Sequence, residues 1–279
     1  MRKIYIALLT FIIIGSAWQQ AFAGFPIGKY RSIVVPSFSY YSSKDTYNRD
    51  GKRIAGANGS GFNSYAFGLY LGYGLTRRMD LLVNLSAPFQ TSKFATANGI
   101  ISQASSGLGD LQVGLSYALV NFNYNSYLSV QVSGIAPLYN NSNKAVALGY
   151  GTYGSEVKLM YSGGLSGKFK GYYNLEAGYR RFFDYQGPNV FIYSATLGTP
   201  IPGRNQITAE IGGQSSSSRD KSFSQNLSIN RDFSFTKAGL GFGHSFTRRF
   251  SLFANGFYTF RGYNSGVGSG VSMQAVLKI

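Results

Sequence analysis

The sequence contains no cysteine, a single histidine and few charged residues. Without cysteine, the chain has no disulfides, no thiolate metal ligands and no cysteine nucleophile. Charged residues make up 13% of the 279 positions, about half of the roughly 25% found in an average domain. Beyond residue 23 there is no run of about 18 apolar residues, which excludes transmembrane helices. Hydrophobic residues make up 44% of the chain, which excludes a disordered protein.

Glycine and aromatic residues are abundant and follow an alternating pattern. The chain has 36 Gly, 22 Tyr and 22 Phe, and large apolar residues recur at every second position, as at Leu111, Val113 and Leu115. A period of two is typical of β-strands, because successive side chains point to opposite faces. We expect about twelve strands of roughly 10 to 14 residues, which is long enough to cross a bilayer when tilted. They are centred on residues 31–42, 65–75, 81–89, 111–119, 128–133, 157–161, 173–179, 189–199, 207–211, 238–242, 250–260 and 271–277.

The connections between these strands favour a membrane barrel over a soluble β-sandwich. Long polar segments, such as residues 43–61 and 90–108, alternate with short turns such as residues 247–249. Long outer loops and short periplasmic turns are typical of outer-membrane barrels. The connections at residues 184–188 and 262–266 are shorter than this pattern predicts.

A sheet in hydrocarbon must close, because an open edge would leave backbone N–H and C=O groups unsatisfied. The sequence therefore predicts an all-β fold, a transmembrane antiparallel β-barrel of about 12 strands. The apolar phase is expected to face lipid, and the small and polar phase is expected to line the lumen. An even number of strands with short turns on one side would place both termini in the periplasm. A barrel of this size is expected to have a narrow or plugged lumen.

The first 23 residues have the features of a secretory signal peptide. Arg2 and Lys3 precede an apolar stretch at residues 4–15, and Ala21-Phe22-Ala23 supplies the small-x-small cleavage pattern. We expect residues 1–23 to be a cleaved signal peptide and residues 24–279 to form the barrel. The predicted location is the outer membrane of a Gram-negative bacterium.

Five charged residues fall in the phase that is expected to face the lumen. Glu156 and Lys158 share one strand, Glu176 and Arg180 the next, and Glu210 lies on a later one. Charges inside a barrel cost less when they form pairs or contact water. Two interpretations stay open: a polar constriction that selects solutes, or a structural lattice of ion pairs that fills a narrow lumen.

No catalytic or metal site is predicted. His244 is the single histidine, and Ser245 follows it directly. Adjacent residues on a strand point to opposite faces, so these two side chains cannot form a nucleophile–base pair. One histidine and no cysteine cannot make a His/Cys metal cluster, and Asp45 and Asp50 are too sparse for a calcium site. We therefore expect no enzyme activity and no cofactor.

The net charge of +16 suggests that the protein could bind nucleic acid. Its cations are scattered and form no stripe with interleaved stacking residues, so we expect no nucleic-acid partner. The pairs Arg77-Arg78 and Arg248-Arg249 occur in similar turn sequences. They could bind phosphates or a periplasmic partner, but solvated cations in hairpin turns are the favoured interpretation. Outer-membrane lipids and a small-molecule solute are the predicted partners, and the oligomeric state stays open.

Two stretches resemble a known family. Gly107-Leu-Gly-Asp110 leads into residues 111–117, and Gly-Tyr-Gly-Leu-Thr-Arg-Arg-Met-Asp-Leu-Leu-Val occupies residues 72–83. These residues are similar to the outer-membrane β-barrel family of phenol-degradation (meta-pathway) operons, distantly related to long-chain fatty-acid transporters. The resemblance implies a channel or transporter for small, hydrophobic or aromatic solutes. Residues 24–30 are too short to supply the N-terminal hatch of the fatty-acid transporters. The alternative is a non-conducting structural or adhesive barrel with partner-binding surface loops.

Overall fold

The computed structural model describes residues 24–279 apart from residues 168–169, 186 and 223–229. The predicted signal peptide, residues 1–23, lies outside the described residues. No helix among the described residues is long and apolar enough to span a membrane. The described elements are β1 (Ser32–Tyr47), β2 (Arg53–Ile54), β3 (Gly61–Gly74), β4 (Met79–Thr96), β5 (Gly99–Ser106), β6 (Asp110–Phe122), β7 (Ser126–Pro137), η1 (Asn141–Asn143), β8 (Gly154–Leu165), β9 (Gly171–Phe182), β10 (Asn189–Ile201), β11 (Asn205–Ser217), β12 (Phe233–Ser245), β13 (Phe250–Tyr263) and β14 (Ser265–Lys278).

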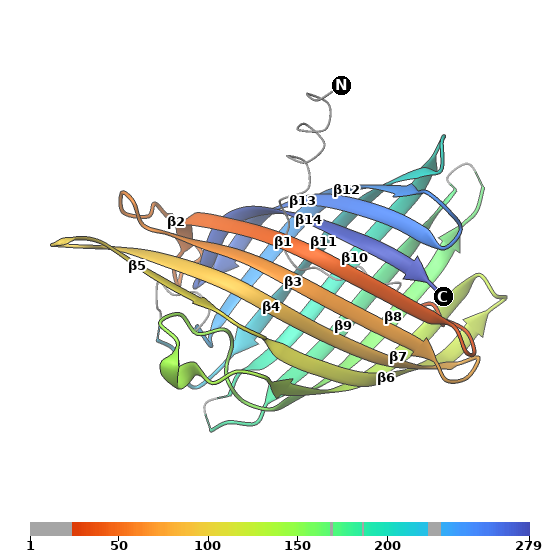
Figure 1. The fold of residues 1–279 in the computed structure, drawn as a ribbon, viewed down its shortest axis with the longest axis horizontal. Coiled ribbons are helices and arrows are strands. Elements are labelled where there is room, and N and C mark those ends of the chain that lie inside the picture. The colour runs from red at the N-terminus through yellow and green to blue at the C-terminus, as the bar shows by residue number, and fades with distance from the viewer. Residues whose placement is uncertain (1–23, 168–169, 186, 223–229) are drawn as a thin grey trace.

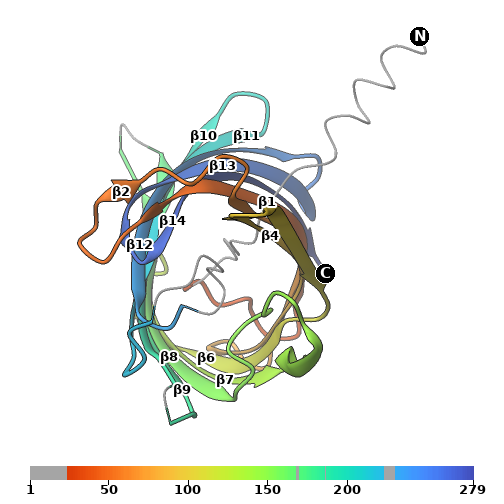
Figure 2. The ribbon, with the colours of Figure 1, turned by 90° about the vertical axis from the view of Figure 1, so that its left-hand side faces the viewer.

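In the described part of the chain, twelve strands form one closed antiparallel barrel (Figures 1 and 2). β1, β3, β4 and β6 to β14 each pair with the next strand in this order, and β14 pairs with β1 from Ile33–Lys278 to Tyr47–Ser265. This last pairing leaves no open edge in the barrel wall, as hydrocarbon requires. The predicted fold is confirmed, and each of the twelve predicted segments overlaps a different one of these strands.

The alternating pattern separates an apolar outer face from a polar inner face. On the outer face, the exposed fractions of Leu69, Leu115 and Leu175 are 36%, 47% and 45%. Except for Tyr70, their strand neighbours in the other phase are small or polar, and inner residues such as Ser116 and Ser133 are buried. The outer face is therefore an apolar surface suited to lipid, and the hydrogen-bonding side chains are collected inside.

The two ends of the barrel differ in the length of their connections. At the short-turn end, strands are joined by residues 75–78, 123–125, 166–170, 202–204 and 246–249. At the long-loop end, the connections include residues 48–60, 138–153 and 218–232, together with the short links at residues 183–188 and Asn264. β1 begins and β14 ends at the short-turn end. That this end faces the periplasm stays a prediction.

Residues 90–108, expected to form a loop, instead form a β-hairpin. β4 continues to Thr96, and β5 pairs with it from Phe89–Ser106 to Thr96–Gly99. β4 pairs with β6 only as far as Leu85–Leu111, so the hairpin projects beyond the barrel wall (Figure 1). At its base Ser92 and Ser105 are buried, and Ser105 Oγ accepts a hydrogen bond from the Val146 N–H of the loop at residues 138–153 at 2.9 Å. Because these buried positions are serines and the tip is exposed, the segment shows no alternation of apolar and polar side chains from which strands could be predicted.

Candidate functional site in the barrel lumen

An ion-pair network lies on the inner face of β8 and β9. Glu156 stands directly opposite Arg180 in the strand register, and opposed residues of an antiparallel pair share one face. Arg180 donates to Glu156 Oε2 from Nε at 2.9 Å and from Nη2 at 2.7 Å. Gln112 Nε2, on β6, donates to Glu156 Oε1 at 2.9 Å. Because both carboxylate oxygens accept hydrogen bonds from well-placed donors, this charge is stabilised although it is buried.

Lys158 extends the network toward the short-turn end. Its Nζ lies 3.3 Å from Glu176 Oε2 and 3.7 Å from Glu156 Oε1. Asn174 Nδ2 donates to Glu176 Oε1 at 2.8 Å. The structure thus brings four of the five predicted lumen residues, Glu156, Lys158, Glu176 and Arg180, into one connected group.

Glu210, the fifth predicted residue, lies on β11, two strands away from β9. It lines a narrow cavity of about 20 Å³ together with Lys237 of β12. Lys237 is buried, and its Nζ lies 3.8 Å from the centroid of the Phe257 ring, within cation–π range. Sequence reasoning missed Lys237, although it shares the phase of Gly239 and Gly241. A lone lysine in the small-residue phase of a strand was the signal that could have identified it.

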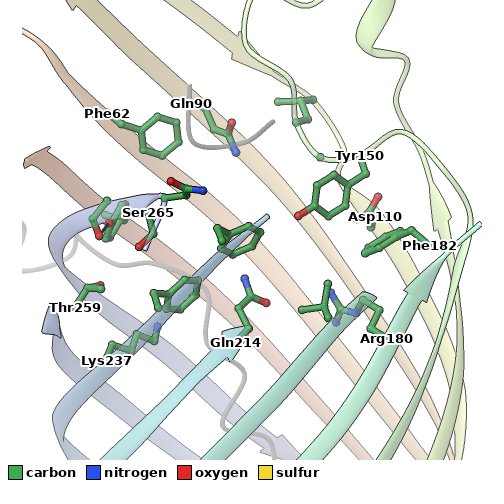
Figure 3. Close-up of a pocket in the computed structure, with 18 of the residues that line it drawn as sticks. Phe62, Gln90, Asp110, Tyr150, Arg180, Phe182, Gln214, Lys237, Thr259 and Ser265 are labelled. Carbon is green, nitrogen blue, oxygen red and sulfur yellow. Dashed lines mark hydrogen bonds between the residues drawn. The ribbon is translucent and has the colours of Figure 1, made fainter. Parts of the chain in front are cut away.

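A cavity of about 370 Å³ occupies the long-loop half of the lumen (Figure 3). We call it the aromatic cavity, because seven of its lining side chains are Tyr41, Phe62, Tyr150, Phe182, Phe233, Phe235 and Phe257. Tyr150 comes from the loop at residues 138–153 and packs edge-on against Phe182, with 4.8 Å between ring centroids. The polar side chains of Gln90, Asp110, Arg180, Gln214 and Lys237 also line it.

Further cavities continue from the aromatic cavity along the lumen. A cavity of about 250 Å³ shares Asp110 and Arg180 with it. A third, of about 70 Å³, shares Asn84 and Gln112 with the second, and Lys158 and Glu176 line it nearer the short-turn end. The ion-pair network therefore lies beside a series of cavities that follows the barrel axis.

Residues 24–31 cross the lumen at the short-turn end. The backbone N–H of Ile27 donates to Asp80 Oδ2 at 3.1 Å, and Ser129 Oγ on β7 donates to the carbonyl oxygen of Gly24 at 2.9 Å. Because β1 and β7 lie four strands apart in the barrel order, this segment reaches across the ring of strands (Figure 2). Its side chains of Phe25 and Ile27 line the 70 Å³ cavity. The sequence pattern did not predict this path.

His244 lies near a turn at the short-turn end and faces away from the lumen. Its Nδ1 is 2.7 Å from Asn205 Oδ1, and its ring packs edge-on against Phe246 at 4.6 Å. Ser245 Oγ is instead 2.9 Å from Ser251 Oγ. Among the described residues, no group of three or more His, Cys, Asp or Glu side chains could hold a metal ion. This arrangement offers no nucleophile–base pair at His244.

A closed barrel of twelve long strands, with an apolar outer face and a polar interior, defines the chain as an outer-membrane β-barrel, the architecture with which strands cross the outer membrane of Gram-negative bacteria. Residues 63–275 match the family described as "Putative MetA-pathway of phenol degradation", and the chain belongs to this family. The resemblance found in the sequence is confirmed.

Solved structures share the fold. The COG4313 outer membrane channel from Pseudomonas putida F1 is similar with a TM-score of 0.73 and 16% identity, covering 95% of this chain and 100% of that chain. The β domain of the Bordetella autotransporter BrkA has a TM-score of 0.50 and 14% identity, covering 90% of this chain and 99% of that chain. At these identities the likeness concerns the fold. No curated protein matches the sequence.

Proposed function

We propose that the protein is an outer-membrane channel that passes small hydrophobic or aromatic solutes, and that it is not an enzyme. The observation that carries this proposal is the aromatic cavity inside a closed barrel with a lipid-suited outer face. A dry cavity of about 150 Å³ is sufficient to bind benzene. A volume of about 370 Å³ therefore accommodates one aromatic ring with substituents.

The series of cavities supports passage rather than storage. The aromatic cavity, the 250 Å³ cavity and the 70 Å³ cavity share lining residues in turn. Along this path Glu156, Lys158, Glu176 and Arg180 form a polar constriction, and Glu210 adds a carboxylate two strands further along the same part of the wall. Such a constriction selects solutes by the charges and hydrogen-bonding groups that they must pass. The phenol-degradation description of the family agrees with an aromatic solute.

Planar bilayers test the proposal. Purified full-length protein should produce stepwise currents in KCl, and small aromatic solutes should reduce these currents when they occupy the lumen. Liposomes that contain the protein should take up such solutes faster than empty liposomes do. Folded protein that gives no current and no uptake would contradict the proposal and favour the structural or adhesive barrel.

A further inference from the structure

We propose that the aromatic cavity binds an aromatic anion, an arenecarboxylate, with its ring among the aromatic side chains and its carboxylate against Arg180, Gln214 and Lys237. This inference rests on the proposed function and specifies its solute class. It distinguishes a charged aromatic solute from a bare hydrocarbon, which the fold and the family description leave equally open.

Hydrogen-bond donors form a row along one wall of the cavity. Figure 3 shows Lys237, Gln214 and Arg180 side by side, with Phe62 and Gln90 on the opposite side. The row follows from the strand register, because Gln214 of β11 lies opposite Phe235 of β12, two residues before Lys237. A hydrocarbon at this wall would displace water from Arg180 and Gln214 without offering a hydrogen-bond acceptor in its place, which is unfavourable. A carboxylate offers two acceptor oxygens.

Arg180 and Lys237 contact neighbouring side chains of the barrel wall and also line the aromatic cavity. Arg180 uses Nε and Nη2 for Glu156, and its Nη1 does not take part in that pair. Lys237 lies over the Phe257 ring and lines the aromatic cavity. Among the described residues that line the cavity, Asp110 is the one with a carboxylate. Its Oδ1 accepts a hydrogen bond from Tyr139 Oη at 2.9 Å. Asp80, Glu156, Glu176 and Glu210 do not line this cavity; Glu156 pairs with Arg180, and Glu210 lies beside Lys237 in the neighbouring 20 Å³ cavity.

Aromatic side chains on the other walls of the cavity provide contacts for the ring of an arenecarboxylate. The Phe233 and Phe235 rings stack with centroids 6.2 Å apart, and Tyr41 and Phe257 stack at 6.3 Å. Offset-stacked and edge-to-face contacts with a further ring would be favourable here. The cavity thus combines an apolar aromatic surface with a cationic wall.

Both mouths of the barrel carry an excess of positive charge. The described short-turn end carries the exposed cations Lys29, Arg31, Arg77, Arg78, Lys170, Arg204, Arg248, Arg249 and Lys278, and the described residues of its turns include no Asp or Glu. The described long-loop end, apart from the projecting β4–β5 hairpin, has ten cations, Lys44, Arg49, Lys52, Arg53, Lys144, Arg181, Arg219, Lys221, Arg231 and Arg261, against five carboxylates in its loops, Asp45, Asp50, Asp184, Asp220 and Asp232. A positively charged mouth raises the local concentration of small anions.

The test compares three solutes of similar size as blockers of the KCl current at pH 7. Benzoate is aromatic and anionic, benzyl alcohol is aromatic and neutral, and cyclohexanecarboxylate is anionic without a ring. We expect benzoate to block at a concentration about tenfold lower than either of the others, a ratio that corresponds to roughly 1.4 kcal/mol. The full-length protein is used, so the solute comparison itself needs no variant.

Variants locate the effect at the cavity wall. Lys237→Met removes the ammonium and keeps an apolar side chain of similar length, and it should abolish the preference for benzoate over benzyl alcohol. Lys237→Arg should retain the preference, because it keeps the charge. Lys93→Met, outside the lumen on the projecting part of β4, is the matched control. The three solutes should block the current of this variant at the same concentrations as in the unchanged protein.

The outcomes separate this inference from the proposed function. Equal or stronger block by benzyl alcohol would overturn the anionic solute and leave the channel intact. Equal block by cyclohexanecarboxylate would overturn the role of the aromatic rings. Failure of all three solutes to affect an open channel would overturn the binding cavity, and absence of any current would overturn the channel together with this inference.

Discussion

Glu156 shows how a charged residue is kept inside this barrel. Its side chain is 1% exposed, and it accepts hydrogen bonds from Arg180 and Gln112 while Lys158 lies nearby. A buried carboxylate is costly unless it is paired and hydrogen-bonded, and so are the cations that it pairs with. The stability of the group therefore depends on all members being present.

Replacing Glu156 by Leu should destabilise the barrel strongly. The substitution leaves the partly buried Arg180 guanidinium without its carboxylate, and we expect the free energy of unfolding to fall by about 3 kcal/mol. Urea titration in detergent, followed by the heat-modifiable migration of the folded barrel on gels, measures this loss. Asp50→Asn, at an exposed loop position, is the control and should change stability by less than about 0.5 kcal/mol. The double variant Glu156→Leu/Arg180→Met should recover part of the loss; a single variant as stable as the control would contradict the argument.

At the scale of elements, residues 24–31 act as a strap across the short-turn end of the lumen. Ile27 packs against the buried side chains of Ile33, Val35 and Val276, and Phe25 meets Tyr127 edge-on at 5.8 Å. These contacts, together with the hydrogen bonds of Gly24 and Ile27, hold the segment inside the ring of strands. The lumen is narrow at this end for that reason.

The strap can be tested by removing its side chains while keeping its length. The variant Phe25→Gly/Ile27→Gly should have a larger single-channel conductance, because both side chains line the 70 Å³ cavity. Tyr30→Gly is the matched control in the same segment, since Tyr30 is 69% exposed and has a φ of 62°, which glycine adopts freely. Unchanged conductance in the double variant would mean that the strap is not the constriction.

Two surface loops are joined by an ion pair that depends on pH. Arg231 Nη1 donates to Asp184 Oδ2 at 2.7 Å, and this hydrogen bond lowers the pKa of Asp184 below its usual 3.8. A lowered carboxylate pKa stabilises the folded state fully above the ordinary value, and the contribution is lost as the pH falls through the lowered one. The pair should thus be intact at pH 7 and broken well below pH 4.

Hydrogen exchange of residues 183–188 measures this change. Exchange, corrected for its intrinsic pH dependence, should increase below pH 4 in the unchanged protein. Asp184→Asn should show the increased exchange already at pH 7, and Asp50→Asn should not. The argument fails if Asp184→Asn protects the loop as well as the unchanged protein does at pH 7.

At the scale of the whole molecule, the sheet must close for the protein to be stable in a membrane. β14 is paired with β13 on one side and with β1 on the other. Without it, both neighbouring strands would present unpaired backbone groups to lipid. The β4–β5 hairpin differs, because beyond the barrel wall its two strands pair with each other.

Two deletions of similar length should therefore have opposite results. Removing residues 265–279 should abolish the heat-modifiable folded form, because the barrel cannot close. Replacing residues 91–104 by an Asn-Gly turn should leave a folded, membrane-inserted barrel, because all β4–β6 pairs and the β3–β4 pairs from Gly74–Asp80 to Ser64–Gln90 are kept. A folded β14 deletion would contradict the requirement for closure.

The barrel could be predicted from the sequence, because a period of two identifies both the strands and their faces. Leu69, Leu115 and Leu175 face outward as their phase predicts, and Glu156, Lys158, Glu176 and Arg180 lie inward. Which charges meet could not be predicted, because a strand pair has many registers that preserve the phase. The hairpin at β4–β5 and the inward Lys237 were missed, the first because its buried positions, Ser92 and Ser105, are not apolar and the second because a single residue makes no pattern.

The sequence by itself determined the number of strands, their membrane-facing side and the collection of charge in the interior, since these follow from local alternation and from the cost of unpaired backbone in lipid. The tertiary structure alone decided that Arg180 meets Glu156, that seven distant aromatic residues enclose one cavity, and that residues 24–31 cross the lumen. These contacts join residues far apart in the chain, and they exist only because closing the barrel sets the register and curvature of every strand.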